Sequence, residues 1–332
     1  MDEGRSNSAD AGARSLPRRT SVSVTTAARL HFGFLDPSGR GAQPFGSFGL
    51  SIDRPVTRLT LRRANSLRIT GEEAERAALY LAQLAESYGL TTGYALNVDE
   101  AIPPHSGLGS GTQLALAVGT ALSTLEDLGA SPQDLASRLG RGARSGIGIA
   151  TFASGGVVLD SGPVGGALPE LVARMPFPED WRVLLIFDPY MAGIQGGAEV
   201  AAFDEADEFS HSETEELRMR VLHRALPALE DHDFDGFTEE VGHLQARMGE
   251  YFASLQGGAI VSKGVAKVLD WVATSGLNGI GQSSWGPTGF AFVRSESDGA
   301  SLLETARGLD DFAGLRFQLV RGRNQGAEIS VY

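Results

Sequence analysis

The pattern of apolar and polar residues predicts strands and helices that interleave along most of the chain. Period-two alternation of β-branched residues indicates strands, and apolar residues at three- and four-residue intervals indicate helices. The predicted strands cover residues 21–26, 48–52, 57–61, 94–98, 155–160, 182–187, 288–293, 315–320 and 327–331. The predicted helices cover residues 72–88, 112–128, 131–140, 213–230, 234–255, 265–274 and 302–309. This interleaving predicts an α+β fold.

Two predicted helices differ in how much of their surface is apolar. The helix 72–88 is amphipathic, and Gly89 is expected to end it. Its residues expected to face inward are Ala78, Leu79, Leu81 and Leu84. The helix that starts at Thr112 is apolar on nearly every side in its first half, so it is predicted to be a buried central helix. Between two strands of the first half lies a glycine-rich excursion, 33–49.

The length of 332 residues predicts two domains of ordinary size. Residues 1–20 are small and polar, which predicts a disordered tail. A stretch rich in glycine and proline, 163–178, is the expected boundary. The predicted domains are therefore 21–170 and 171–332.

Charge and composition exclude several classes of function. The formal net charge of −13 argues against binding to nucleic acid or to anionic membrane surfaces. The absence of cysteine excludes disulfides and thiolate chemistry. The chain has neither a secretory signal nor an apolar run of about 18 residues, so a cytoplasmic protein is expected.

A glycine-rich loop between a predicted strand and a predicted helix carries the chemistry. Glycines at alternate positions let backbone N–H groups approach a ligand, and the following helix adds the positive end of its dipole. The residues predicted to bind phosphate here are Pro104, His105, Ser106, Gly107, Leu108, Gly109, Ser110, Gly111 and Thr112. The alternative is a glycine-rich turn before a buried helix. The loop lacks the lysine of a P-loop and the last glycine of a dinucleotide fingerprint.

The loop PPHSGLGSG resembles the phosphate loop of the GHMP kinase superfamily, P-x-x-x-G-L-G-S-S. The segments ARLHFG (28–33) and GQSSWGPTG (281–289) resemble two further motifs of that superfamily. The resemblance implies a ribosomal-protein-like N-terminal α/β domain and a ferredoxin-like C-terminal domain, with the ligand between them.

One feature argues against kinase activity. Kinases of this superfamily usually carry an aspartate, in a pattern like S-G-x-D-x-A, that helps to activate the attacking hydroxyl. Gly148 stands at that position here, and no carboxylate occurs from Arg141 to Leu159. The sequence predicts a phosphate binder with different chemistry. An ATP-dependent small-molecule kinase and a non-catalytic phosphometabolite-binding protein remain the alternatives.

Four segments together resemble the β-ribofuranosylaminobenzene 5′-phosphate synthases: ARLHFGFLD, IPPHSGLGSGTQLALA, RSGIGIATFASGG and SSWGPTGFAFV. The resemblance implies condensation of 5-phosphoribosyl diphosphate with 4-aminobenzoate or 4-hydroxybenzoate, with loss of pyrophosphate and carbon dioxide. The product would begin the aromatic part of tetrahydromethanopterin. Magnesium is the expected cofactor and a homodimer the expected assembly.

The remaining candidate residues lie outside the loop. Arg29 and His31 are predicted to bind phosphate or the aromatic carboxylate, the alternative being surface residues of a loop. Arg141 and Arg144 are predicted to hold the ribose phosphate, or are solvated helix-end arginines. The predicted opposite wall consists of Ser283, Ser284 and Trp285, whose indole could stack on the benzoate or belong to the core. The predicted magnesium ligands are Ser110 and Glu199.

Overall fold

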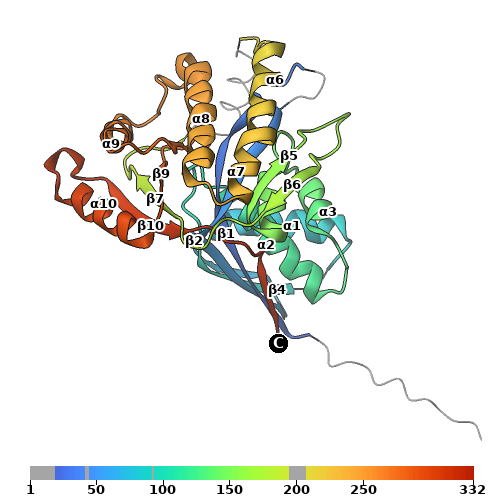
Figure 1. The fold of residues 1–332 in the computed structure, drawn as a ribbon. Helices are drawn as coiled ribbons and strands as arrows, with labels where there is room; N and C mark the ends of the chain where they lie inside the picture. Colours follow the sequence, from blue (N-terminus) through green and yellow to red (C-terminus); the bar gives the residue numbers. More distant parts are fainter. Residues whose placement is uncertain (1–18, 42–44, 92, 194–206) are drawn as a thin grey trace, which may run out of the picture.

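The computed structural model describes residues 19–41, 45–91, 93–193 and 207–332, and in these ranges two sheets form the framework (Figure 1). The seven-stranded sheet has the order β11-β1-β2-β4-β3, and β5 extends it by pairing with β2 and β6. Its strands are β1 (Ser21–Asp36), β2 (Phe45–Ala64), β3 (Arg68–Gly71), β4 (Gly93–Glu100), β5 (Val157–Asp160), β6 (Leu171–Met175) and β11 (Glu328–Val331). The four-stranded sheet has the order β10-β7-β9-β8. Its strands are β7 (Arg182–Phe187), β8 (Ile280–Gln282), β9 (Gly289–Val293) and β10 (Arg316–Arg321).

Helices pack on both sheets. Those of the first half are α1 (Ala74–Ser87), α2 (Ser110–Leu125), α3 (Pro132–Arg138) and α4 (Ile147–Ser154). Those of the second half are α6 (His211–Arg220), the π-helical turn η1 (Val221–Ala225), α7 (Leu226–Glu230), α8 (Phe234–Gln256), α9 (Lys263–Ala273), α10 (Glu296–Gly308) and the 3-10 turn η2 (Asp310–Phe312). The predicted α+β class is confirmed. None of the helices in the described ranges combines the length and the apolar character needed to cross a membrane.

The long hairpin of β1 and β2 replaces two features that the sequence predicted differently. The strands predicted at 48–52 and 57–61 are parts of one strand, β2, and residues 33–36 and 45–49 of the predicted excursion belong to β1 and β2. Both faces of the hairpin are covered in this part, because residues 30–36 and 46–52 are all buried. Gly33 faces Met248 of α8, whereas Gly49 faces Ile147 of α4.

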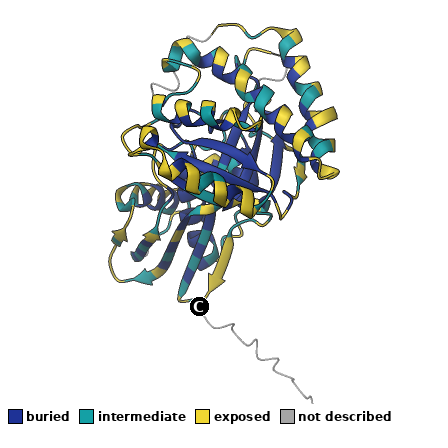
Figure 2. Cartoon of the chain, turned by 60° about the vertical axis from the view of Figure 1, so that its left-hand side comes forward, coloured by how far each residue is buried: buried dark blue, intermediate teal, exposed yellow. Residues whose placement is uncertain are grey.

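The core explains where the helix predictions hold. Helix α2 is buried along nearly its whole length, as predicted. Helix α1 buries Ala77, Tyr80, Leu81 and Leu84, whereas the side chain of Leu79 is 69% exposed. The prediction for Leu79 was wrong because that residue lies off the face with three- and four-residue spacing. Figure 2 shows buried strands at the centre and exposed outer helix faces.

Some elements escaped the sequence analysis. The strands β3, β6 and β8 and the helix α4 were not predicted, and α10 begins six residues before the predicted 302. The strands β6 and β11 lie in the seven-stranded sheet, although the predicted division placed both sequences in the second half. A cluster of buried aromatic residues joins the two sheets. The ring centroid of Phe32 in β1 lies 5.6 Å from that of Phe290 and 5.7 Å from that of Phe292, both in β9, and the rings are inclined to one another.

Candidate active site

The glycine-rich loop ends in the N-terminus of α2. Gly107 and Gly109 have φ angles of 80° and 81°, a left-handed conformation that suits glycine. Gln113 N donates to Gly109 O at 3.0 Å, so the N–H groups of residues 110–112 have no acceptor within the helix. The first turn of α2 contains no acidic residue. These amides and the helix dipole favour an anion at this position, and phosphate binding by the loop stays a prediction.

The loop packs backbone against backbone on the C-terminal glycine-rich motif. A Cβ atom added at Gly107 would lie 2.1 Å from Ser283 O, and one at Gly286 would lie 2.2 Å from Gly107 N. The Ser283 hydroxyl donates to Gly107 O at 2.8 Å and accepts from His31 N at 3.0 Å. Ser283, expected to touch the substrate, is thus fully buried and joins three segments of backbone.

Arg29 lies against the same loop. Its guanidinium donates to Gly107 O, and its main-chain N–H donates to Leu108 O at 3.1 Å. A Cβ atom at Gly109 would lie 3.2 Å from the Arg29 side chain. Arg29 therefore fixes the loop conformation and also brings positive charge to it.

A pocket of about 460 Å³ opens at the loop. Its lining consists of Arg29, Arg76, Tyr80, His105, Gly107, Gly109, Ser110, Gly111, Thr112, Arg141, Gly193, Ser284, Trp285 and Gly286. Three arginines belong to this lining, and none of its described members is an aspartate or glutamate. The pocket combines helix N-terminal amides with guanidinium groups, which suits a ligand with several anionic groups.

One wall of this pocket was missed by the sequence analysis. Arg76 and Tyr80 stand four residues apart on α1, and the Arg141 guanidinium donates to the Tyr80 hydroxyl. The Nε atoms of Arg76 and Arg141 are buried without a hydrogen-bond partner in the described part of the chain. A terminal nitrogen of Arg76 also lacks hydrogen-bond geometry, although it lies 3.1 Å from Glu73 Oε2. The i, i+4 spacing was visible in the sequence, but not that this face of the helix reaches the loop.

Several predicted residues lie elsewhere. Leu108 is fully buried in the core, and the Ser106 hydroxyl donates to Pro103 O at 2.7 Å. Pro104 and Arg144 are not among the described residues that line the pocket. Glu199 lies outside the described residues.

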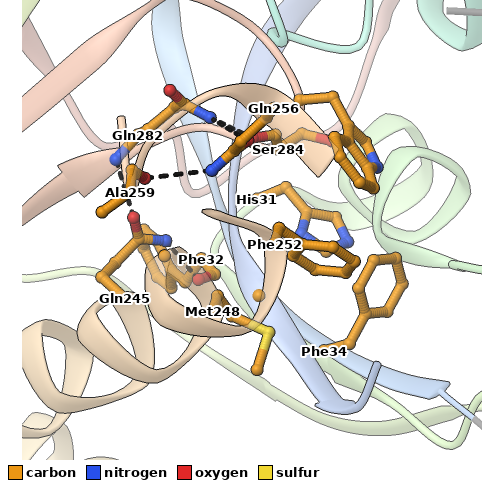
Figure 3. A pocket seen from close by; sticks show the side chains of 13 residues that line it. His31, Phe32, Phe34, Gln245, Met248, Phe252, Gln256, Ala259, Gln282 and Ser284 are labelled. Carbon is orange, nitrogen blue, oxygen red and sulfur yellow. Dashed lines mark hydrogen bonds between the residues drawn. The ribbon is translucent and has the colours of Figure 1, made fainter. Parts of the chain in front are cut away.

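A second, narrower pocket of about 40 Å³ adjoins the first, because Ser284 and Trp285 line both (Figure 3). His31 lines this second pocket rather than the pocket at the loop. Its side chain is buried, and burial, together with the charge of Arg29, lowers the pKa of His31 to about 3. The imidazole is therefore neutral at ordinary pH, and its predicted binding of phosphate or of the aromatic carboxylate stays a prediction.

Gly148 packs directly on the start of α2. A Cβ atom at Gly148 would lie 2.9 Å from Thr112 Cγ2. The Gln113 side-chain amide also donates to Gly148 O at 2.8 Å, which ties α4 to α2. A side chain at position 148, where kinases of this superfamily carry their carboxylate, would therefore have to displace the Thr112 side chain.

The buried carboxylate of Asp160 lies close to the segment that precedes α4, but it does not belong to the pocket lining. It accepts hydrogen bonds from the N–H groups of Gly146 at 2.7 Å, Ser47 at 3.1 Å and Gly162 at 2.8 Å. Burial raises the pKa of Asp160 to about 6, against the opposing effect of these donors. Asp160 therefore orders this turn of the backbone.

The magnesium prediction concerns Ser110 and Glu199, and only Ser110 belongs to the described residues. Within the described ranges no three histidine, aspartate or glutamate side chains are grouped as metal ligands would be. Magnesium in proteins usually takes one or two carboxylates in addition to substrate phosphates. Ser110, one of the two predicted ligands, lines the pocket at the loop. The other predicted ligand, Glu199, lies outside the described residues. Magnesium stays a prediction.

The two sheets and the loop at the N-terminus of α2 define a protein with the GHMP kinase fold. The family model of the GHMP kinases N terminal domain matches residues 73–156. The fold is shared with homoserine kinase from Cytophaga hutchinsonii, with a TM-score of 0.67 and 17% identity over 96% of this chain and 100% of the other.

The sequence relatives are more specific. A beta-ribofuranosylphenol 5'-phosphate synthase of Archaeoglobus fulgidus is 31% identical over 93% of this chain and 99% of its own length. One of Methanothermobacter thermautotrophicus is 26% identical over 92% of this chain and 97% of its own length. The chain belongs to the family of beta-ribofuranosylphenol 5'-phosphate synthases, which confirms the resemblance of the four segments.

Proposed function

We propose that this protein condenses 5-phosphoribosyl diphosphate with 4-hydroxybenzoate or 4-aminobenzoate and releases pyrophosphate and carbon dioxide. The observation that carries the proposal is a pocket of helix N-terminal amides and arginines without a carboxylate among its described lining residues. The relatives are named for a phenol product, so 4-hydroxybenzoate is the acceptor to test first.

The substrate carries two anionic groups, and the pocket offers two sets of donors. We assign the diphosphate to the open amides of residues 110–112 and the 5-phosphate to Arg76 and Arg141. The amides stabilise the negative charge that develops on the diphosphate as its bond to C1 of the ribose breaks. Forked guanidinium contacts fix the other end of the substrate.

The acceptor needs no base from the protein. The ring carbon that bears the carboxylate attacks C1, and the bond to the carboxylate then breaks, so that its electron pair restores the aromatic ring. Carbon dioxide leaves in place of a proton. This chemistry agrees with Gly148 at the position of the kinase aspartate and with its close packing against Thr112.

The proposal has three further parts. They are magnesium bound to the diphosphate with Ser110 and Glu199 as ligands, a homodimer, and a cytoplasmic location. A magnesium titration of activity and sedimentation of the purified protein test the first two.

The test supplies the protein with magnesium, 5-phosphoribosyl diphosphate and carboxyl-labelled 4-hydroxybenzoate, and then with 4-aminobenzoate. The expected result is release of labelled carbon dioxide and pyrophosphate in equal amounts with at least one acid. The kinase alternative instead requires ADP formation from ATP with a small alcohol. Pyrophosphate release that does not depend on either acid would refute the proposal.

A further inference from the structure

The second pocket has aromatic walls on several sides (Figure 3). Its walls come from β1, from α8 and from the connection between β8 and β9. The ring centroids of His31 and Phe34 lie 4.7 Å apart, and those of Phe252 and Trp285 lie 4.4 Å apart. Such walls favour a flat apolar group, which can stack on faces and meet edges.

The polar side chains that reach this pocket are almost all engaged with the protein. Gln245 donates to Phe32 O and accepts from Gln282 N at 2.7 Å. The side-chain oxygen of Gln282, Oε1, accepts from Val261 N at 2.7 Å. Gln256 donates to Ala259 O at 3.1 Å. These amides build the wall and leave little capacity to bind a ligand.

His31 Nε2 differs from these amides. This nitrogen is buried and has no hydrogen-bond partner in the described part of the chain, and the whole residue is only 3% exposed. A buried polar atom without a hydrogen-bond partner destabilises a protein, so such an atom calls for an explanation. A ligand in the pocket that offers a hydrogen-bond donor would remove this destabilising effect.

The position of the pocket indicates what that ligand is. Ser284 and Trp285 line it together with the pocket at the loop, so a ring held here lies beside the anions held there. Ser284 N donates to His31 O at 3.2 Å, which fixes the border between the two pockets.

We propose that the second pocket holds the ring of the aromatic acid, whose para hydroxyl or amino group donates a hydrogen bond to His31 Nε2. This inference rests on the proposed function. The ring carbon that bears the carboxylate then faces the loop pocket across the border formed by Ser284 and Trp285.

His31 contributes to the reaction as an acceptor. As the bond between the ring carbon and C1 of the ribose forms, the bond from C1 to the diphosphate breaks and the diphosphate leaves with the electron pair. Positive charge then spreads through the ring to the para oxygen, and a hydrogen bond to a neutral imidazole stabilises it. Loss of carbon dioxide returns two electrons to the ring, and the para proton stays on its oxygen. A neutral imidazole suits this role because an imidazolium would repel the charge.

The small size of the second pocket gives Met248 a part in admitting the ring. A volume of about 40 Å³ is smaller than the roughly 150 Å³ cavity that accepts benzene. The ring therefore enters only if a wall moves, and Met248 has the most flexible side chain of the lining. Met248 is expected to restrict the acceptor to rings without a substituent beside the para group.

The test compares binding of 4-hydroxybenzoate and 4-methylbenzoate, which lacks the donor, by calorimetry with magnesium pyrophosphate present. The native protein is expected to prefer the hydroxy acid about tenfold, as one hydrogen bond to a buried group allows. His31→Phe should abolish the preference and lower kcat/KM at least tenfold. The matched control His223→Phe, at an exposed position, should retain both.

The outcomes separate this inference from the proposed function. Tenfold preference without any turnover would keep the subsite and refute the reaction. Turnover with equal binding of the two acids, or a preference that survives in His31→Phe, would overturn the inference. If His31→Phe does not fold, Met248→Ala provides the test. This variant should turn over 3-methyl-4-hydroxybenzoate, and failure to do so would also overturn the inference.

Discussion

Replacing Gly107 by alanine tests whether the loop is held by its contact with the C-terminal motif. The added Cβ would lie 2.1 Å from Ser283 O and 2.8 Å from Gly286 Cα. Neither neighbour is a flexible side chain, so the backbone itself has to move. Because carbon and oxygen need more than 3 Å, the loop would shift by about 1 Å.

The expected loss has two separable parts. Alanine in the left-handed conformation costs about 1–2 kcal/mol of stability. Gly129 provides a matched control, because its φ is +64° and nothing lies within 4 Å of the added Cβ. Gly129→Ala therefore carries only the conformational cost. Gly107→Ala carries that cost and also the displacement, and a displacement of about 1 Å at a reacting centre lowers the rate about 100-fold.

The assay measures kcat/KM for 5-phosphoribosyl diphosphate and the free energy of unfolding for both variants. Gly107→Ala is expected to be about 100-fold less active and Gly129→Ala fully active, although both are destabilised. Equal activity of the two variants would refute the argument that this contact shapes the anion site.

Three other predictions concern the surroundings of the loop. Gly148→Ala should destabilise the fold by about 1 kcal/mol through its contact with Thr112. Adding Thr112→Ser, which deletes the contacting methyl group, should recover most of that loss of stability, whereas additive effects of the two substitutions would contradict the role of the contact. The pKa of Asp160 is raised from 3.8 to about 6, so its contribution to stability is present below the unfolded pKa and is lost as the pH rises through about 6. When the pH falls from 7 to 5, the free energy of unfolding of the native protein should therefore rise by about 1 kcal/mol more than that of Asp160→Asn, as measured by denaturant titration. If the free energies of unfolding of the two proteins change in parallel with pH, the pKa of Asp160 is not raised. Arg76→Gln should raise KM for 5-phosphoribosyl diphosphate about tenfold, whereas the exposed control Arg294→Gln should leave it unchanged.

The sequence predicted those elements whose pattern is local. The buried helix α2 and the amphipathic helices of the second half follow from the periodicity of their own residues. The continuity of strand β2 did not, because Asp53, Arg54 and Pro55 interrupt the apolar pattern between the two strands that were predicted. Helix α4 was missed because it is short and nearly uniformly apolar.

The site shows the same division between local and distant information. The loop and its helix could be predicted because the glycines that bring amides to a ligand are adjacent in sequence. The roles of Arg76 and His31 depend on packing between segments that are distant in sequence, and a local sequence pattern does not predict such packing. His31 was noticed beside Arg29, but only burial shows that it is neutral and belongs to the second pocket.

The chemistry of the site follows from what its described residues lack as much as from what they supply. A pocket with helix N-terminal amides and guanidinium groups can hold anions and stabilise a departing diphosphate, and its described lining residues include no carboxylate that could remove a proton from an acceptor. A kinase of this superfamily would need an added carboxylate here. Gly148 stands at the position where those kinases carry it, and it packs on Thr112. An acceptor that loses carbon dioxide instead of a proton avoids this requirement. The GHMP kinase fold can thus support carbon–carbon bond formation with its anion site kept and its base removed.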